Sequence, residues 1–156
     1  MDNPHAARPD RYLAPGRFTT RVFNPTVAWL TRHGVSVLGS RVLAVRGRSS
    51  GQWRETPVNL LSLDGEQYLV SPRGSTQWVR NLRAAGEGRL RVGHRSVEFK
   101  AVELADSEKP PVLRAYLRRW RFEVGQFFDG VGPGASDDEL TAVGPKHPVF
   151  RVTTTA

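Results

Sequence analysis

Apolar and polar residues alternate along three segments in the first half of the chain. The alternation runs through Arg41–Arg46, Trp53–Leu63 and Glu66–Ser71, and a period of two residues is typical of a half-buried β-strand. Asp64 and Gly65 separate the second and third segments, and Asp-Gly is one of the strongest short-range hairpin signals. The pattern therefore predicts three consecutive antiparallel strands, with a longer tip between the first two.

The second half of the chain contains another hairpin pattern and a final strand pattern. Arg89–Gly93 and Val97–Leu104 carry apolar residues at alternate positions, with a polar turn between them. Pro148–Thr154 has the same character near the end of the chain. These segments bring the number of predicted strands to about six.

Residues with capping preferences mark two helices in the first half. Asn24 and Pro25 favour a helix start, and Gly34 favours its end. A second helix is expected after Ser75 or Thr76 and runs to residue 85, where a glycine follows.

Two more helices are expected in the second half. Asp106 or Ser107 is the predicted N-cap of the longest helix, whose first turn accommodates two prolines. Ser136 and Glu139 form a predicted capping box for a short helix that ends near Gly144. The apolar stripe of the longest helix consists of Leu113, Leu117, Trp120, Val124 and Phe127.

The order of these elements indicates the fold class. Short antiparallel strands with helical insertions are typical of an α+β protein, here a small split β-barrel of about six mainly antiparallel strands with flanking helices. Residues 1–22 show no clear period and are predicted to form an irregular N-terminal arm. Residues 23–156 are predicted to form one domain, which a length of 156 residues suits.

Composition excludes several kinds of catalysis. The chain has no cysteine, and its four histidines lack any metal-ligand spacing, so we expect neither thiolate chemistry nor a metal site. It also lacks the G-x-S-x-G elbow of serine hydrolases and the G-x-G-x-x-G turn of Rossmann proteins. Redox chemistry would therefore depend on a cofactor bound in another way.

The net charge of +8 comes almost entirely from arginines that are spread along the chain. This distribution favours anionic small ligands or an anionic membrane surface, and we do not expect nucleic acid as a partner. No apolar run reaches membrane-spanning length. The expected location is the cytoplasm, with weak association to the inner membrane face.

Two predicted turns are suited to binding anions. The tip within 46–59 contains Gly47 and Gly51, which allow positive φ and exposed N–H groups, flanked by Arg48 and Arg54. Backbone donors and guanidinium groups together suit a phosphate or a carboxylate. A solvated polar hairpin is the alternative interpretation.

The second turn, Ser71–Ser75, lies between a predicted strand and a predicted helix. A helix start offers free N–H groups and the positive end of the helix dipole. Arg73 is expected in the same region, followed by Trp78 and Asn81 on the helix. Core packing is the alternative role for Trp78.

The spacing of these residues resembles a known family. Gly47-Arg48-x-Ser-Gly51-x-x-Arg54-x-x-Pro57-Val58, followed by Tyr-Leu-Val-Ser-Pro-Arg-Gly over Tyr68–Gly74, resembles the actinobacterial deazaflavin-dependent nitroreductase family. The resemblance runs from about residue 24 to the last strand. It implies a split β-barrel that binds reduced coenzyme F420 and reduces nitroaromatics, quinones or activated alkenes.

The resemblance also implies roles for individual residues. Ser49 stands where family members commonly have lysine, so this contact to the cofactor tail is absent or replaced. Ser71 or Tyr116 is the expected proton donor, if the reaction needs one. The implied cofactor-binding residues are Arg48, Ser49, Arg54, Thr56, Pro57, Val58, Val70, Ser71, Arg73, Gly74, Trp78 and Asn81.

The acceptor pocket is expected on the other side of the cofactor ring. Asn59 stands where relatives have a pocket tyrosine, which leaves the acceptor open. The other expected lining residues are Trp120, Phe127 and Phe128, together with the N-terminal arm.

Two other functions remain as alternatives. The same architecture binds FMN in other split-barrel proteins, and a barrel of this kind can also bind a lipid or an anionic ligand without catalysis. A nucleic-acid module is supported by charge alone. The protein is expected to be a monomer or a homodimer.

Overall fold

The computed structural model describes residues 40–155, except for the side chains of 121–123. The predicted arm over 1–22 and the predicted helix over 25–34 therefore lie outside the described residues. The described residues form a strand barrel and the helices connected to it.

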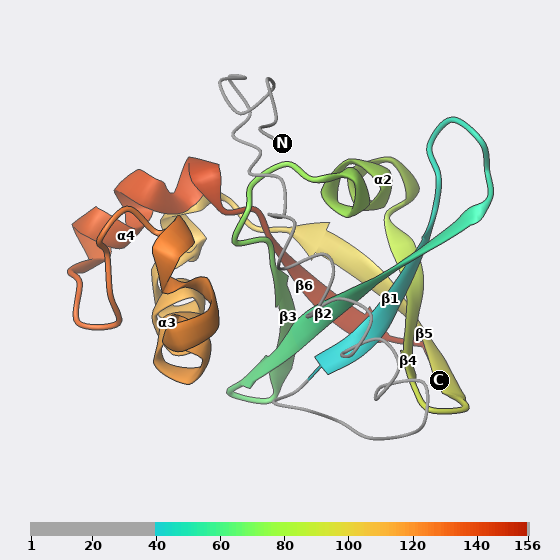
Figure 1. Cartoon of the computed structure of the whole chain (residues 1–156), viewed down its shortest axis with the longest axis horizontal. Coiled ribbons are helices and arrows are strands. Elements are labelled where there is room, and N and C mark those ends of the chain that lie inside the picture. The colour runs from blue at the N-terminus through green and yellow to red at the C-terminus, as the bar shows by residue number, and fades with distance from the viewer. Residues whose placement is uncertain (1–39, 156) are drawn as a thin grey trace.

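Six strands close into one antiparallel barrel, which confirms the predicted fold class (Figure 1). Their order around the barrel is β1-β2-β3-β6-β5-β4, so the chain leaves the barrel after β3 and after β5 and returns each time. The strands are β1 (Ser40–Arg46), β2 (Trp53–Leu63), β3 (Glu66–Val70), β4 (Glu87–Val92), β5 (Arg95–Glu103) and β6 (Val149–Thr154).

The alternation seen in the sequence sorts side chains between the two faces of the barrel wall. Leu43 and Val45 of β1 point inward and are almost fully buried, while Arg46 is exposed. On β5, Phe99 is buried between the exposed residues Glu98 and Lys100. Burial of apolar area contributes about 25 cal/mol per Å², so a shift of one residue in register would expose the whole inner set.

Helix α2 (Gln77–Ala85) covers one end of the barrel (Figure 1). Its Val79 and Leu82 are 0% and 1% exposed and belong to the cluster that fills the barrel. The helix ends at Gly86, which has φ of 70° and donates its N–H to Leu82 O. This left-handed cap is favourable for glycine, and it turns the chain directly into β4.

Helices α3 (Pro110–Val124) and α4 (Asp137–Val143) form a second layer beside the barrel (Figure 1). Their apolar side chains pack on the outer face of β2, β3 and β6 in a separate cluster. Its buried members are Leu61, Val70, Val112, Leu113, Tyr116, Leu117, Trp120, Val124, Phe128, Leu140, Val143 and Val149.

The predicted start of the longest helix was wrong by several residues. Asp106–Glu108 forms a separate 3-10 turn, and α3 begins only at Pro110. Proline lacks the N–H that a helix interior needs, so it favours the first turn. The capping box of Ser136 and Glu139 is confirmed, with Ser136 Oγ accepting from Glu139 N–H at 3.2 Å.

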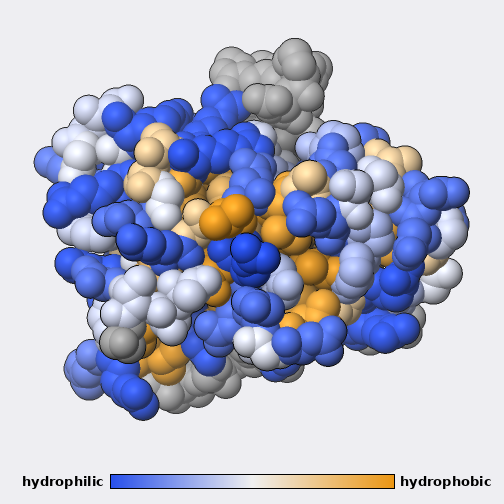
Figure 2. Space-filling view, turned by 180° about the vertical axis from the view of Figure 1, so that it is seen from behind, coloured by the Kyte–Doolittle hydropathy of each residue, from blue (hydrophilic) through white to orange (hydrophobic). Residues whose placement is uncertain are grey.

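The surface seen from behind is mainly hydrophilic, with apolar residues gathered near the middle of the face (Figure 2). Trp53 and Val102 are the large apolar side chains that are exposed among the described residues, at 38% and 56%. The barrel and the helical layer therefore bury most of the large apolar residues of the described chain.

Candidate functional site

The tip between β1 and β2 is held by its own hydrogen bonds. Gly47 N–H donates to Gln52 O at 2.7 Å, and Gly51 N–H donates to Gly47 O at 2.8 Å. Gln52 N–H donates to Ser50 Oγ at 3.2 Å. Gly51 has φ of 71°, as expected, but Gly47 does not adopt positive φ. Three of the backbone donors expected to bind a ligand are thus used within the tip.

Arg48 connects this tip to helix α2. Its N–H donates to Asn81 Oδ1 at 3.1 Å, and its Nη1 donates to the same oxygen at 2.8 Å. Nη1 also donates to Gln77 Oε1 at 2.9 Å. Because Gln77 is the first residue of α2, these bonds place a guanidinium group beside the first turn of the helix.

Arg54 lies on the same side of the hairpin but has no such attachment. It alternates with Val58 and Leu60 on the inner face of β2, and both apolar residues pack in or against the barrel cluster. Its guanidinium makes no ion pair or hydrogen bond within residues 40–155. An exposed guanidinium group without a partner among these residues is available to bind an anion.

Trp53, the neighbour of Arg54, lies on the opposite face of the same strand. The guanidinium carbons of Arg46 and Arg89 lie 4.6 and 4.3 Å from the centroid of its ring. These cation–π contacts stabilise the outer face of the hairpin. The two faces of β2 thus carry different arginines with different partners.

The start of α2 contains an unsatisfied buried group. Thr76 is the N-cap, but its side chain makes no capping hydrogen bond. Its Oγ1 is buried and has no partner among the described residues. The first N–H groups of any helix also lack intrahelical partners, and the first turn of α2 has no acidic residue. These donors and the adjacent guanidinium suit a bound phosphate.

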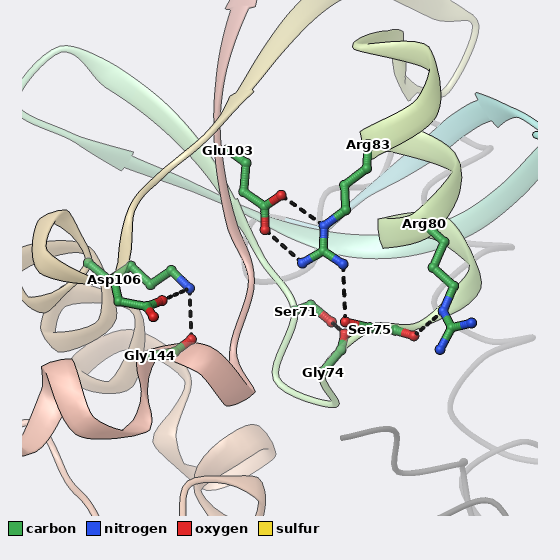
Figure 3. A network of polar contacts seen from close by, with 9 residues as sticks. Ser71, Gly74, Ser75, Arg80, Arg83, Glu103, Asp106 and Gly144 are labelled. Atoms are coloured by element: carbon green, nitrogen blue, oxygen red, sulfur yellow. Dashed lines mark hydrogen bonds and ion pairs between the residues drawn. The ribbon is translucent and has the colours of Figure 1, made fainter. Parts of the chain in front are cut away.

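The loop that precedes α2 is closed by Ser71. Its hydroxyl donates to Gly74 O at 2.5 Å, and Gly74 has φ of 89° (Figure 3). The Ser71 side chain is fully buried. The structure thus places the predicted proton donor in a loop-closing hydrogen bond.

Two arginines of α2 hold the far end of this loop (Figure 3). Arg80 Nε donates to Ser75 O at 3.1 Å, and Arg83 Nη1 donates to Ser75 Oγ at 3.2 Å. Arg83 also forms a two-pronged pair with Glu103, with both N···O distances at 2.8 Å. Paired hydrogen bonds of this kind fix direction as well as distance, so the loop enters α2 in one defined geometry.

Arg73 and Phe127, predicted for the cofactor site and the acceptor pocket, lie together. The guanidinium carbon of Arg73 is 5.4 Å from the Phe127 ring centroid. Trp78 packs against Phe150 with ring centroids 6.0 Å apart, at the edge of the barrel cluster. Arg73 therefore faces the helical layer, whereas Arg48 faces α2.

Other predicted site residues lie in the core beside α3. Tyr116, Trp120 and Phe128 are at most 2% exposed, and the Tyr116 ring is tilted against the Trp120 ring with centroids 5.1 Å apart. Asn59 instead lies within β2, opposite Ser40 of β1, whose Oγ donates to Asn59 Oδ1 at 3.4 Å. Tyr116, Trp120 and Phe128 belong to the cluster of the helical layer, and Asn59 lies in the barrel wall.

The remaining predicted residues line the strands between these groups. Thr56, Pro57 and Val58 are half-buried along β2, and Ser49 is exposed at the tip. Val70 is buried in the cluster beneath the helical layer. Arg41 pairs with Val58 across the hairpin; burial lowers the pKa of Arg41, and the nearby charge of Arg119 lowers it further.

Three residues that matter for this geometry were not predicted as site residues, although Thr76 was a predicted N-cap. Gln77 anchors Arg48, and Thr76 contributes the unsatisfied hydroxyl. His147 donates its Nδ1–H to Pro72 O at 3.1 Å. A threonine at a helix start was a usable signal for the first two, because threonine favours the N-cap position. Nothing near His147 in sequence indicated its contact 75 residues away.

A family model described as F420H(2)-dependent quinone reductase matches residues 19–124. This is well over half of the chain. The chain belongs to this family. The match includes the tip, the loop before α2, and α2 itself, and it confirms the family resemblance seen in the sequence. No curated protein sequence matches the chain.

Solved structures share the fold at low sequence identity. An F420-H2 dependent reductase, FDR-A, aligns with a TM-score of 0.53 and 17% identity, covering 74% of this chain and 94% of its own. A protein of unknown function from Agrobacterium tumefaciens aligns with a TM-score of 0.55 and 17% identity, covering 92% and 60%. A structure described as a domain-swapped dimer has a TM-score of 0.55 and 15% identity, covering 83% and 95%. These likenesses support the barrel fold alone.

Within residues 40–155, no helix is long and apolar enough to cross a membrane. The same part of the chain has no group of three or more His, Cys, Asp or Glu side chains that could hold a metal ion.

Proposed function

We propose that this protein is an F420-dependent oxidoreductase that transfers hydride from the reduced deazaflavin to a quinone, a nitroaromatic or an activated alkene. The observation that carries the proposal is the attachment of Arg48 to Gln77 and Asn81. This attachment brings together two segments that are far apart in sequence and suited to binding anions: the tip between β1 and β2 and the start of α2. Membership of the F420H(2)-dependent quinone reductase family supports F420 as the cofactor.

The residues present fit a phosphate-bearing cofactor. The first N–H groups of α2 lack intrahelical partners, and the buried Thr76 Oγ1 beside them lacks a partner in the described part of the chain. The Arg48 side chain is already fixed beside α2, so it loses little conformational entropy when an anion binds. Arg54 is exposed on the α2 side of the hairpin, where it is suited to the carboxylates of the cofactor tail.

Bound F420 would supply the redox chemistry, since the reduced deazaflavin carries the hydride. The residues of this chain would bind the cofactor and orient its ring. The loop over 71–75 is fixed at both ends by hydrogen bonds, and such preorganisation holds a ring without reorganisation during the reaction. Thr56, Pro57 and Val58 offer a half-buried strand surface beside it, which would exclude water from one ring face.

We assign no side chain as proton donor. Ser71 donates its hydroxyl hydrogen to Gly74 O, and Tyr116 packs among aromatic rings in the helical layer. Solvent can protonate a reduced quinone or nitro group, so the reaction does not need either residue. The proposed acceptor pocket includes Phe127 beside Arg73 and leaves out the fully buried Trp120 and Phe128.

The test compares two cofactors and two reductants. Purified protein is titrated with F420 and, separately, with FMN, and the fluorescence of each cofactor is followed. Loss of reduced F420 is then measured with menadione or a nitroaromatic as acceptor, with NADPH as the control reductant. We expect F420 binding and turnover with reduced F420 only. Tight FMN binding without F420 binding would make the protein an FMN-binding split barrel, and binding of neither would leave a non-catalytic anion or lipid binder.

A further inference from the structure

His147 is a buried histidine at the boundary between the helical layer and the barrel. Its side chain is 0% exposed, and it stands at the end of the 3-10 turn Gly144–Lys146, just before β6. Its ring stacks on Phe128 with centroids 3.8 Å apart and an interplanar angle of 14°. A polar ring in so apolar a position is normally retained for its hydrogen bonds.

The ring contacts the loop that precedes α2. His147 Nδ1 lies 3.1 Å from Pro72 O, and the next residue, Pro148, accepts a hydrogen bond from Ser71 N–H at 2.9 Å. Two consecutive residues just before β6 thus hold two consecutive residues just after β3. A carbonyl oxygen can only accept, so Nδ1 must carry the hydrogen in this contact.

The backbone of His147 is also held by a hydrogen bond. His147 N–H donates to Gly144 O at 3.0 Å. The same oxygen accepts from Lys109 Nζ at 2.7 Å, and Lys109 pairs with Asp106 at 2.7 Å (Figure 3). With Phe128 on its face and this cluster at its backbone, the ring has little freedom to leave Pro72 O.

The contact fixes the entrance of the loop, while α2 fixes its exit. Arg80 and Arg83 bind Ser75 at the exit. Between these two attachments lie Arg73, which faces Phe127, and Gly74 with φ of 89°. If the entrance were released, the loop could rotate about Ser71 and move the start of α2 relative to Arg48.

We infer that His147 is a positioning residue for the cofactor site: its Nδ1–H holds Pro72 O and so sets the geometry of the loop over 71–75. The inference rests on the proposed function for the ligand, but the hydrogen bond acts on the loop whether or not a cofactor is bound. It also explains why a histidine, and not an aliphatic residue, occupies a position stacked on a phenylalanine.

Two substitutions separate the hydrogen bond from the packing. His147→Asn keeps an N–H donor at the place of Nδ1 but loses the aromatic stack. His147→Phe keeps a ring on Phe128 but loses the donor. If His147 has a purely structural role, F420 affinity and thermal stability should both depend on the ring stack. Both should then be lower in His147→Asn than in His147→Phe.

If His147 positions the loop, F420 affinity should depend instead on the hydrogen-bond donor to Pro72 O. We expect the F420 Kd to rise about three- to tenfold in His147→Phe and to stay near the wild-type value in His147→Asn. The melting temperature should fall more in His147→Asn, because it loses the stack. If His147→Phe is too unstable to purify, His147→Leu also removes the donor. Wild-type F420 affinity in the variant without the donor would overturn the inference. The inference would also be overturned if the variant with the lower melting temperature had the lower F420 affinity.

A second measurement does not depend on the cofactor. Amide hydrogen exchange in the peptide over 71–76 is compared among the cofactor-free proteins. We expect faster exchange in His147→Phe than in wild type, and near-normal exchange in His147→Asn. Unchanged exchange in His147→Phe would also overturn the inference. If wild-type protein fails to bind F420, the proposed function fails, while this exchange comparison still decides the role of His147.

Discussion

The two arginines of the hairpin differ in what they already contact. Arg48 has Gln77 and Asn81 as partners, so part of its contribution is to attach the tip to α2. Arg54 has no side-chain partner in the described part of the chain, so its charge does little for the fold. Exposed charges without partners contribute little to stability. Arg54 is therefore the better residue for separating binding from folding.

Arg54→Ala should weaken F420 binding without affecting the free energy of unfolding. A hydrogen bond to a charged group contributes roughly 1.5–3 kcal/mol, which corresponds to a Kd about tenfold higher or more. The measurements are a fluorescence titration and a denaturant melt. Arg95→Ala is the matched control, because Arg95 is an exposed arginine at the start of β5, in the turn from β4. Equal affinities for the Arg54 and Arg95 variants would exclude Arg54 from the site.

At the scale of the elements, β4 depends on a close approach that only glycine permits. Gly88 pairs with Phe99 of β5, and a Cβ on Gly88 would lie 2.8 Å from Ala44 O and 2.9 Å from Phe99 Cζ. Ala44 belongs to β1, so this one residue brings three neighbouring strands together. Gly86, two residues earlier, has open space around its Cβ direction but φ of 70°.

These two glycines give a matched pair of substitutions. Gly88→Ala forces a contact with a backbone oxygen and a buried ring, and overpacking of this kind costs about 1–3 kcal/mol. Gly86→Ala meets no atoms and incurs only the cost of the left-handed conformation, about 1 kcal/mol. Urea melts should therefore show the larger loss for Gly88→Ala. A smaller loss at Gly88 than at Gly86 would mean that β1 and β5 move apart at little cost.

At the scale of the whole molecule, the sequence allowed the barrel to be predicted better than the site. The alternation placed β2 at its observed ends, because the inward residues in the barrel core must be apolar. It could not show that the tip uses its own N–H groups, since these bonds depend on the conformation around Gly51. Nor could it place Trp120 and Phe128, because an aromatic stripe looks the same in a core and in a pocket. Contacts such as Arg48 with Asn81 arise only from the packing of distant segments.

The overall charge gives a further expectation for the proposed cofactor. The chain has a formal net charge of +8, and F420 carries a phosphate and tail carboxylates. Attraction between exposed opposite charges is screened over about 10 Å at 0.1 M salt and about 3 Å at 1 M. The long-range part of the attraction should therefore decline as salt is added, while contacts to the ring should not.

We expect the F420 Kd to rise about fivefold or more between 50 and 500 mM NaCl. The deazaflavin chromophore without its phosphate and tail is the matched control ligand, and its weaker binding should be nearly independent of salt. Arg54→Ala should show a shallower salt dependence than wild type, because one of the attracting charges is gone. Fluorescence titrations at four salt concentrations measure all three. A salt dependence that is equal for F420 and for the tail-free chromophore would show that the arginines do not bind the tail, because a screened attraction to the tail must disappear when the tail is absent.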